Sequence, residues 1–359
     1  MKIFSTLKLG NIELNNRIIM APMTRSRATG NIPNDSMAEY YAIRADAGLL
    51  ITEGTAPSAN GLGYPRIPGI YSQAQIIGWK KVTDAVHAKG GKIFIQLMHT
   101  GRISHPLNME QGTQVVAPSA IQAVGQMYTD AEGMKAHPVP KEMTKADILA
   151  TQEEYVQSAK NAIEAGFDGV EIHGANGYLI DQFNNAGSNH RIDEYGGSAE
   201  NRSRFALEVA KKISEEIGAD KTGIRLSPFG VYNDMAIFDG LEEQFVYLAT
   251  ELGKLNLAYL HIVDHSSQGA PEVPQSIKDK MNEAFDGIFI ASGGLNKEKA
   301  EAILNNGQGD LVAFGVPFLA NPDLVERFKN NAELNAPDMG TFFTPGEKGY
   351  LDYPTLETA

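Results

Sequence analysis

The 359-residue sequence predicts an α/β protein, a (β/α)8 barrel of the TIM type that spans residues 1–359 as a single domain. Short apolar runs bounded by Gly, Pro or Asn recur along the chain, and amphipathic stretches separate most of them. The runs are nearly continuous rather than alternating, which is typical of parallel strands covered by helices on their outer face. The eight expected strands are residues 17–22, 49–53, 92–97, 169–173, 222–226, 258–263, 287–291 and 311–314.

Amphipathic helices are indicated between these runs. Apolar residues recur every four positions from Phe205 to Ile217, between Ser198, a typical N-cap residue, and Gly218, a typical helix end. Strands that alternate with such helices fit a barrel, whose site is expected at the C-terminal ends of the strands. A doubly wound open sheet is the alternative, but no Gly-x-Gly-x-x-Gly pattern follows the first strand.

Three segments depart from this alternation. Residues 4–15 carry two short apolar runs around Gly10-Asn11, which indicates an N-terminal hairpin that closes the bottom of the barrel. Residues 100–143 are rich in Gly, Pro and Gln and too long for a simple connection, so they predict an insertion after the third strand, over the barrel mouth. Residues 337–354 are expected to wrap around the outside.

The composition excludes several kinds of site. With no cysteine, the chain has no disulfide, thiol nucleophile, Cys-ligated zinc or iron–sulfur cluster, so redox chemistry needs a non-covalent organic cofactor or a metal held without thiolate. We expect no metal. A formal charge of −13 without a basic run argues against nucleic acid and membrane partners. No stretch approaches about 18 apolar residues, and residues 1–14 lack the apolar core of a secretory signal, so a cytoplasmic protein is expected. We also expect a monomer or a small homo-oligomer.

The fourth expected strand runs directly into a polar cluster that contains His173, Asn176 and Tyr178. Such a cluster at the end of a buried barrel strand is typical of a site. His173 and Asn176 offer neutral hydrogen-bond donors, and Tyr178 keeps its proton at neutral pH because a phenol has a pKa of about 10. The three residues are therefore candidates for holding an oxyanion and protonating carbon, although each taken alone also fits a structural role.

Other strand ends carry groups that suit a flavin. Thr24, Gln96 and Arg225 supply a hydroxyl, an amide and a fixed cation, and Arg225 would stabilise negative charge on a reduced ring. A buried guanidinium needs an anionic partner, so an ion pair with Glu53 or Glu171 is the alternative for Arg225.

Glycine-rich turns follow the last two strands. Ser292-Gly293-Gly294 and Phe314-Gly315 each precede an expected helix, where backbone N–H groups and a helix N-terminus bind phosphate in many barrels. A plain strand-to-helix turn is the alternative for Ser292-Gly293-Gly294.

Five motifs resemble the Old Yellow Enzyme family, and in particular its bacterial N-ethylmaleimide reductase and alkene reductase branch. They are residues 17–27, 96–102, 173–183, 224–228 and 320–324. The resemblance implies a (β/α)8 barrel that binds FMN non-covalently, is reduced by NADPH or NADH, and passes hydride from flavin N5 to the β-carbon of an activated alkene. Quinones and nitro compounds are further expected substrates.

The resemblance also implies roles for individual residues. His173 and Asn176 would bind the carbonyl oxygen of the substrate, and Tyr178 would protonate its α-carbon. The expected cofactor-binding residues are Ala21, Pro22, Met23, Thr24, Gly54, Ala56, Gln96, Arg225, Ser292, Gly293, Gly294, Phe314 and Gly315. The expected substrate-binding residues are His173, Asn176, Tyr178, Tyr64, Met98 and Tyr350.

The chain departs from the family pattern at two positions. Met98 stands where this branch usually has Trp, so a roomier pocket is expected near the flavin. Val316 stands where the family has an Arg near the FMN phosphate, so phosphate binding is expected to depend more on backbone N–H groups. The insertion and residues 297–299 are the candidates for supplying a cation instead.

Two other functions remain open from the sequence. One is a barrel lyase or isomerase that acts on a phosphorylated metabolite, with Tyr178 or His173 as the acid–base group. The other is a flavin-binding protein that has lost turnover.

Overall fold

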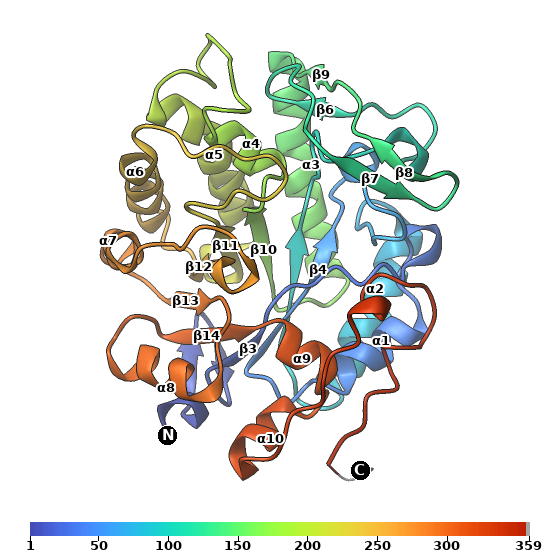
Figure 1. Cartoon of the computed structure of the whole chain (residues 1–359), viewed down its shortest axis with the longest axis vertical. Coiled ribbons are helices and arrows are strands. Elements are labelled where there is room, and N and C mark those ends of the chain that lie inside the picture. The colour runs from blue at the N-terminus through green and yellow to red at the C-terminus, as the bar shows by residue number, and fades with distance from the viewer. Residues whose placement is uncertain (357–359) are drawn as a thin grey trace.

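A closed barrel of eight parallel strands lies at the centre of the molecule, in a computed structural model that describes residues 1–356 (Figure 1). The strands pair in the order β10-β11-β12-β13-β14-β3-β4-β5, and β5 pairs with β10 to close the circle. The predicted barrel and all of its expected strands are confirmed. The strands are β3 (Ile18–Met20), β4 (Leu49–Thr55), β5 (Ile93–Leu97), β10 (Gly169–Gly174), β11 (Thr222–Leu226), β12 (Tyr259–Ile262), β13 (Phe289–Ser292) and β14 (Leu311–Phe314).

Helices surround the strands on the outside of the barrel (Figure 1). The helix predicted from the spacing of apolar residues runs from Ala199 to Ile217, and the side chain of Ser198 accepts a hydrogen bond from the backbone of Asn201 at its start. Gly218 ends it with φ 103°, a conformation that favours glycine. The helices are α1 (Asp35–Ala42), α2 (Gln73–His87), α3 (Lys145–Glu164), α4 (Leu179–Asn184), α5 (Ala199–Ile217), α6 (Leu241–Gly253), α7 (Gln275–Phe285), α8 (Lys297–Asn305), α9 (Val316–Ala320) and α10 (Leu324–Asn330).

Successive residues of a strand face the barrel interior and the surrounding helices in turn. In β3, Ile19 packs in the interior cluster, whereas Ile18 and Met20 pack in the cluster that includes the helices. In β5, Phe94 faces inward and Ile95 outward in the same way. Because both faces of each strand are buried, the apolar runs in the sequence are continuous.

A hairpin closes the N-terminal end of the barrel, as predicted. Strand β1 (Leu7–Leu9) pairs with antiparallel β2 (Ile12–Leu14), and the turn between them places Gly10 at φ 54°. The side chains of Leu9 and Leu14 are fully buried in the interior cluster. The apolar filling of this end leaves the C-terminal end of the barrel for a site.

The insertion after β5 is also confirmed. It contains a parallel pair, β6 (Val116–Ala117) with β9 (Lys141–Glu142), and a hairpin of β7 (Gln126–Thr129) and β8 (Gly133–Ala136).

The insertion covers part of the barrel mouth. Ile103, Ala123 and Met127 form a small buried cluster, and Tyr64 and Tyr178 pack against it. Since Tyr178 follows the C-terminal end of β10, the insertion lies where the sequence predicts it.

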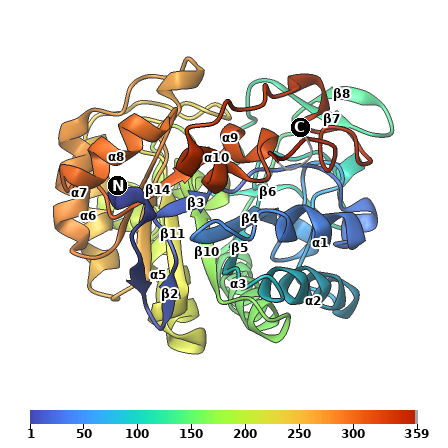
Figure 2. The same ribbon diagram turned by 90° about the horizontal axis from the view of Figure 1, so that it is seen from below.

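The C-terminal segment runs along the outside of the barrel and is anchored by two buried arginines that follow β3 (Figure 2). Arg25 donates to the carbonyl oxygens of Phe342 (3.1 Å) and Gly349 (2.7 Å). Arg27 donates to those of Thr341 (2.8 Å) and Phe342 (2.7 Å). The end of the chain is therefore bonded to the segment that leads out of the first barrel strand.

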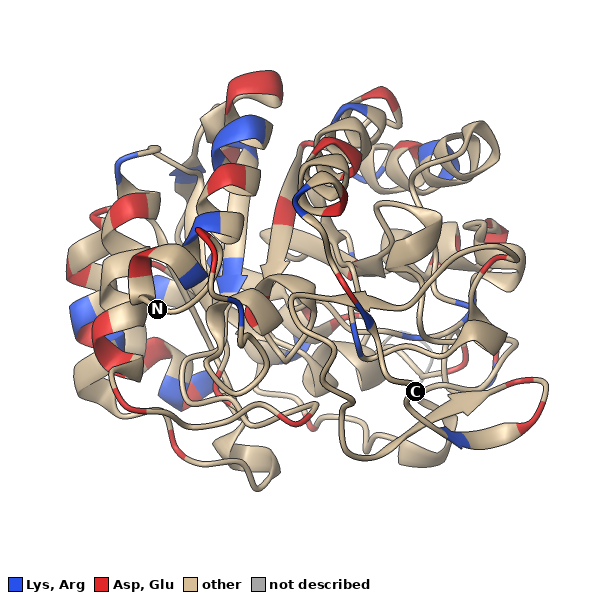
Figure 3. Ribbon diagram, turned by 90° about the horizontal axis from the view of Figure 1, so that it is seen from above, with Lys and Arg blue, Asp and Glu red and all other residues tan. Residues whose placement is uncertain are grey.

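Charged residues of both signs are mixed along the outer helices (Figure 3). Lys212 on α5 pairs with Glu153 on α3 at 2.7 Å; the side chain of Glu153 is exposed and that of Lys212 is partly exposed. Such exposed pairs contribute little to stability, so the helical shell is held mainly by its apolar packing. Within residues 1–356, none of the helices has the length and apolar character to cross a membrane.

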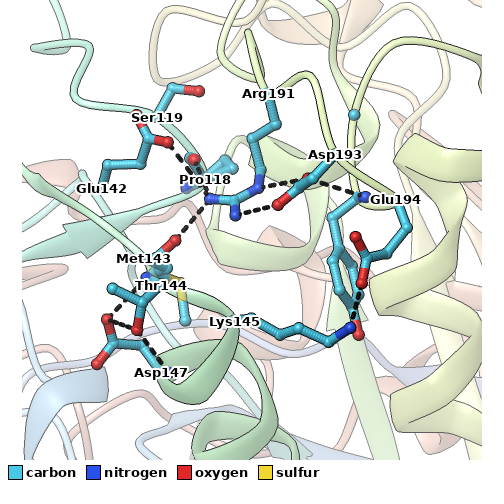
Figure 4. Close-up of polar contacts among 12 residues, drawn as sticks. Pro118, Ser119, Glu142, Met143, Thr144, Lys145, Asp147, Arg191, Asp193 and Glu194 are labelled. Atoms are coloured by element: carbon cyan, nitrogen blue, oxygen red, sulfur yellow. Dashed lines mark hydrogen bonds and ion pairs between the residues drawn. The ribbon is translucent and has the colours of Figure 1, made fainter.

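Arg191 ties two segments of the insertion to the loop between α4 and α5 (Figure 4). Its Nη1 atom donates to the carbonyl oxygens of Pro118 (2.9 Å), which follows β6, and Met143 (2.6 Å), which follows β9. Its Nε and Nη2 atoms bind the carboxylate of Asp193 at 3.0 and 2.5 Å. The guanidinium fork thus joins both insertion strands to the loop between α4 and α5.

Arg191→Ala is expected to lower the free energy of unfolding by about 2–4 kcal/mol, because it leaves two buried carbonyl oxygens without their charged donor. Urea unfolding measures this loss, and limited proteolysis is expected to cut residues 100–143 faster. Lys145→Ala is the matched control, since it removes an exposed ion pair to Glu194 from the same region. Equal behaviour of the two variants would show that Arg191 does not hold the insertion.

Candidate active site

A layer of polar side chains lies above the apolar filling of the barrel. His173, Arg225 and His261 are aligned on the neighbouring strands β10, β11 and β12. Glu171 precedes His173 by two residues and is aligned with Gln96 on β5. All five side chains are buried, and alternation along each strand directs them into the barrel.

Glu171 is the anion of this layer. Its carboxylate accepts hydrogen bonds from Gln96 Nε2 (2.7 Å) and from His261 Nδ1 (2.8 Å). Burial raises its pKa, but the nearby His261, Arg225 and Gln96 outweigh burial and bring the pKa below its ordinary value. The group is therefore ionised at neutral pH, and its two neighbours must present their N–H groups to it.

Arg225 is a buried cation without a hydrogen-bond partner. Its side chain has no hydrogen bond to any residue of the described chain, and its Nε atom is completely covered. Burial lowers its pKa, and the charge of Glu171 opposes that change. Glu171 thus balances the charge from nearby, but neither it nor Glu53 forms the ion pair considered as the alternative. The free N–H groups fit an acceptor-rich group at the barrel mouth.

Gln96 is oriented by the same carboxylate. Because an ionised carboxylate only accepts hydrogen bonds, the amide nitrogen of Gln96 must face Glu171. The amide oxygen is left to accept a bond from elsewhere. It suits an N–H group such as the one on the pyrimidine edge of a flavin.

His173 is held as a neutral donor. Its Nδ1 atom accepts the backbone N–H of Ala175 at 3.3 Å, so its single proton lies on Nε2. Burial lowers the pKa of His173 well below its ordinary value, and the positive charge of Arg225 lowers it further. The ring therefore donates a hydrogen bond at neutral pH without carrying a charge.

Tyr178 lies beside this donor and keeps its proton. Its ring meets that of His173 edge to face, with centroids 4.9 Å apart, and its hydroxyl donates to Tyr64 Oη at 3.1 Å. Burial raises the pKa of Tyr178 above 10. Met98 and Ala56 belong to the buried cluster against which Tyr64 and Tyr178 pack, so the structure brings these predicted residues together.

Both backbone polar groups of Asn176 are hydrogen-bonded to neighbouring side chains. Its φ of 58° lies in the left-handed region, which asparagine tolerates better than most residues. Its N–H donates to Ser227 Oγ (2.8 Å), and its carbonyl oxygen accepts from Asn233 Nδ2 (2.7 Å). The side-chain oxygen lies 2.9 Å from Nε2 of His265. Asn176 itself stays partly exposed at the barrel mouth.

The expected phosphate turns occupy the ends of β13 and β14. Gly293 and Gly294 have φ of 123° and 58°, and a Cβ on Gly293 would lie 2.3 Å from the carbonyl oxygen of Asp264. Only glycine fits there. Val316 begins α9 and is partly exposed.

Lys297, one of the expected cation candidates near this end, is already engaged. Lys297 is buried, and its Nζ donates to the carbonyl oxygen of Phe328 and to Asn331 Oδ1 (2.5 Å) at the end of α10. It therefore does not replace the family arginine as an unpaired charge. Backbone N–H groups remain the candidates for a phosphate.

Two predicted residues lie away from this cluster. Phe314 packs its ring on Phe328, with centroids 5.2 Å apart, so at most its backbone faces the barrel mouth. Tyr350 is fully buried and stacks on Tyr40 of α1 at 4.1 Å, beside Arg27. Its ring contacts belong to the anchor of the C-terminal segment, and its role in substrate binding stays a prediction.

The remaining predicted residues line the strand ends. Pro22, Met23 and Thr24 follow β3 and are partly exposed, although the strand itself is buried. The hydroxyl of Thr24 has no hydrogen bond to another residue within 1–356. At Gly54 a Cβ would lie 2.4 Å from the sulfur of Met98, so the backbone there approaches that side chain closely.

Comparison with known proteins identifies the family. Residues 2–335 match the model of the NADH:flavin oxidoreductase / NADH oxidase family. The chain belongs to this family. A probable flavin mononucleotide-dependent alkene reductase of Leishmania infantum is 41% identical over 98% of this chain and 96% of its own length. The 12-oxophytodienoate reductase 7 of Oryza sativa subsp. japonica is 42% identical over 99% of this chain and 94% of its own.

Solved structures agree with this assignment. Morphinone reductase superposes with a TM-score of 0.95 and 43% identity, over 99% of this chain and 96% of its own. The Old Yellow Enzyme homologue from Zymomonas mobilis gives a TM-score of 0.94 and 40% identity, over 99% and 100%. The resemblance to the Old Yellow Enzyme family is confirmed, and the protein is an NAD(P)H-dependent FMN oxidoreductase. The lyase or isomerase alternative finds no support among these relatives.

The residues at the barrel centre fit FMN. Arg225 offers unpaired N–H donors, Gln96 keeps a free amide oxygen, and Thr24 has a free hydroxyl; these are the residues that would hold the ring. The turn at Gly293-Gly294 would hold the phosphate through backbone N–H groups.

Some residues of the site carried no assigned role in the sequence. His261 was detectable, because β12 directs every second residue inward and His261 is aligned with Arg225. The others lie in loops or on a short helix, where no periodicity marks the side that faces a site. They are Asp181, Ser227, Asn233 and His265.

Asp181 supports the turn that carries Asn176. Its carboxyl accepts the backbone N–H of Gly177 (2.8 Å) and the hydroxyl of Ser227 (3.2 Å). Burial raises its pKa from 3.8 to about 7. The folded state therefore prefers the protonated carboxyl of Asp181. Its preference stabilises the protein fully below about pH 4, and that stabilisation is lost as the pH rises to 7.

Asp181→Asn is expected to keep both accepted bonds and to remove this pH dependence. The variant should gain stability relative to the parent as the pH rises from 4 to 7, by at most about 1.4 kcal/mol per pH unit. Urea unfolding of both proteins at several pH values measures the difference, in which other titrating groups cancel. A difference that does not change with pH would contradict the raised pKa of Asp181.

Proposed function

We propose that this protein is an ene-reductase that reduces the carbon–carbon double bond of α,β-unsaturated carbonyl or nitro compounds. The single barrel domain of residues 1–359 would be a cytoplasmic monomer or small homo-oligomer that uses NADPH or NADH and has no nucleic acid or membrane partner. The observation that carries the proposal is that His173, held as a neutral N–H donor, lies beside the protonated hydroxyl of Tyr178, with Asn176 between them in the chain at the same strand end. When bound, FMN supplies the hydride for the β-carbon.

The two donors act on the substrate oxygen. Reduction at the β-carbon places negative charge on the carbonyl or nitro oxygen, and fixed N–H donors stabilise that charge as it develops. His173 suits this role because its lowered pKa keeps it neutral, so it donates a hydrogen bond without giving up a proton. Asn176 cannot ionise at all, which leaves the proton transfer to another group.

Tyr178 is the group that gives the proton. Its hydroxyl carries a proton at neutral pH and lies at the same strand end as the donors. Tyr64, whose hydroxyl is 3.1 Å away, is placed to stabilise the resulting phenolate by hydrogen bonding. A proton taken up from solvent at the partly exposed mouth then restores the hydroxyl of Tyr178.

The names of the relatives support carbonyl substrates. They include reductases of 12-oxophytodienoate, morphinone and chanoclavine-I aldehyde, the last from Penicillium roqueforti at 44% identity. Morphinone reductase has also been solved with tetrahydroNAD, which supports a nicotinamide as the reductant. Met98, buried beside Tyr64 and Tyr178, would shape the part of the pocket that selects among such substrates.

Tyr178→Phe is expected to separate the two half-reactions. Reduction of the bound flavin by NADPH should remain near normal, because the phenol acts only on the alkene. Reoxidation by cyclohexenone should slow by roughly 10²–10⁴, the usual contribution of a positioned general acid. Anaerobic stopped-flow absorbance measures both rates; equal slowing of the two, or of neither, is the outcome that rules out this role.

Combined His173→Ala and Asn176→Ala substitution is expected to weaken phenol binding. A bound phenolate mimics the oxyanion, and each lost hydrogen bond to a charged group is worth about 1.5–3 kcal/mol. Titration with para-chlorophenol should give a long-wavelength charge-transfer band in the parent and none in the double variant. Retention of the band and of the parent affinity would show that this pair does not bind the oxygen.

A further inference from the structure

His265 contacts the side chain of Asn176 from a loop that no part of the proposed reaction uses. The loop follows β12, and the Nε2 atom of His265 lies 2.9 Å from Asn176 Oδ1. The imidazole also packs against Tyr232, with ring centroids 4.4 Å apart and planes 53° apart. His265 is partly buried, so this contact is sheltered from competing water.

The amide of Asn176 has only one orientation that serves the reaction. Its nitrogen donates and its oxygen accepts, and the two ends have nearly the same shape. A donor to the substrate oxygen requires the nitrogen to face the pocket and the oxygen to point away. Since the backbone of Asn176 is already fixed by Ser227 and Asn233, the torsion of the amide is the freedom that remains.

We propose that His265 is a positioning residue, whose Nε2–H donates to Asn176 Oδ1 and thereby turns the amide nitrogen towards the substrate oxygen. The inference rests on the proposed function, because it assumes that Asn176 binds that oxygen. His265 itself touches neither substrate nor cofactor in this assignment. It acts through Asn176, as an orienting residue acts through a metal ligand or a catalytic histidine.

The protonation state of His265 is consistent with this role. Burial lowers its pKa to about 4, with a further contribution from the charge of Arg225, while Asp264 opposes the change. The neutral imidazole carries one N–H proton, on either Nδ1 or Nε2. Nδ1 has no hydrogen-bonding partner within residues 1–356, whereas Nε2 faces an acceptor, so the proton belongs on Nε2.

The contact predicts a coupling between the two residues. His265→Phe keeps an aromatic ring against Tyr232 but removes the donor. In the parent background it should weaken para-chlorophenol binding about three- to thirtyfold. In an Asn176→Ala background the same change should have almost no effect, because the amide that it orients is gone.

A matched set of variants separates positioning from simple packing. His265→Gln carries an amide N–H in place of Nε2–H and should restore most of the phenol affinity. Tyr232→Phe is the control, since it removes a hydroxyl bonded to Gln268 at 2.9 Å and leaves the contact to Asn176 intact. His265→Ala provides a second loss of the donor if the Phe variant folds poorly. FMN content and the flavin absorbance spectrum establish that each variant is folded.

The readout is the dissociation constant of para-chlorophenol, followed through its charge-transfer band. Equal losses from His265→Phe in both backgrounds, or no loss in either, would overturn the positioning role. No rescue by His265→Gln would do the same. Failure of the proposed function gives a different result, because Asn176→Ala alone would then leave phenol binding unchanged.

Discussion

The buried carboxylate of Glu171 is the group on which the polar centre of the barrel depends. It receives hydrogen bonds from Gln96 and His261 and balances the charge of Arg225 from the adjacent strand. A guanidinium without an anion nearby would be strongly disfavoured in this interior. Glu171 therefore allows a cation with free N–H groups to lie beneath the mouth, where a flavin ring with hydrogen-bond acceptors is expected.

Arg225 in turn helps burial to keep the nearby His173 and His265 neutral. Its charge adds to burial in lowering the pKa of both His173 and His265. Both rings are therefore neutral donors at physiological pH rather than acids. The proton for the substrate has to come from a group of a different kind, and Tyr178 is the neighbour that has one.

The repeating strands and helices of the barrel could be predicted from the sequence. Apolar runs predicted every barrel strand, because two-sided burial leaves a continuous signal, and polar residues at their ends marked His173 and Tyr178 as neighbours. Phe314 was expected in the site as part of the turn with Gly315, and its ring packs on Phe328, so a role for its backbone at the phosphate stays a prediction.

Contacts between loops could not be predicted from patterns in the sequence. Nothing in the sequence near His265 indicates that it meets Asn176, because the contact joins residues 89 positions apart through two irregular segments. Tyr350 shows the same limit. It was expected among the substrate-binding residues, whereas its ring contacts are with Tyr40 and the arginines after β3. Packing of long-range loops is set by the whole fold and leaves no local pattern.

The anchoring of the C-terminal segment by Arg25 and Arg27 has a consequence for biosynthesis. Both arginines leave the ribosome more than 300 residues before the carbonyl groups that they bind, which lie at residues 341–349. The barrel also closes between β14 and β3, so its first strand has no partner on one edge until the last strand emerges. Until β14 and residues 341–349 have been synthesised, a nascent chain therefore lacks the carbonyl partners of these arginines and has an open edge on β3, a state that exposes it to aggregation or to chaperones.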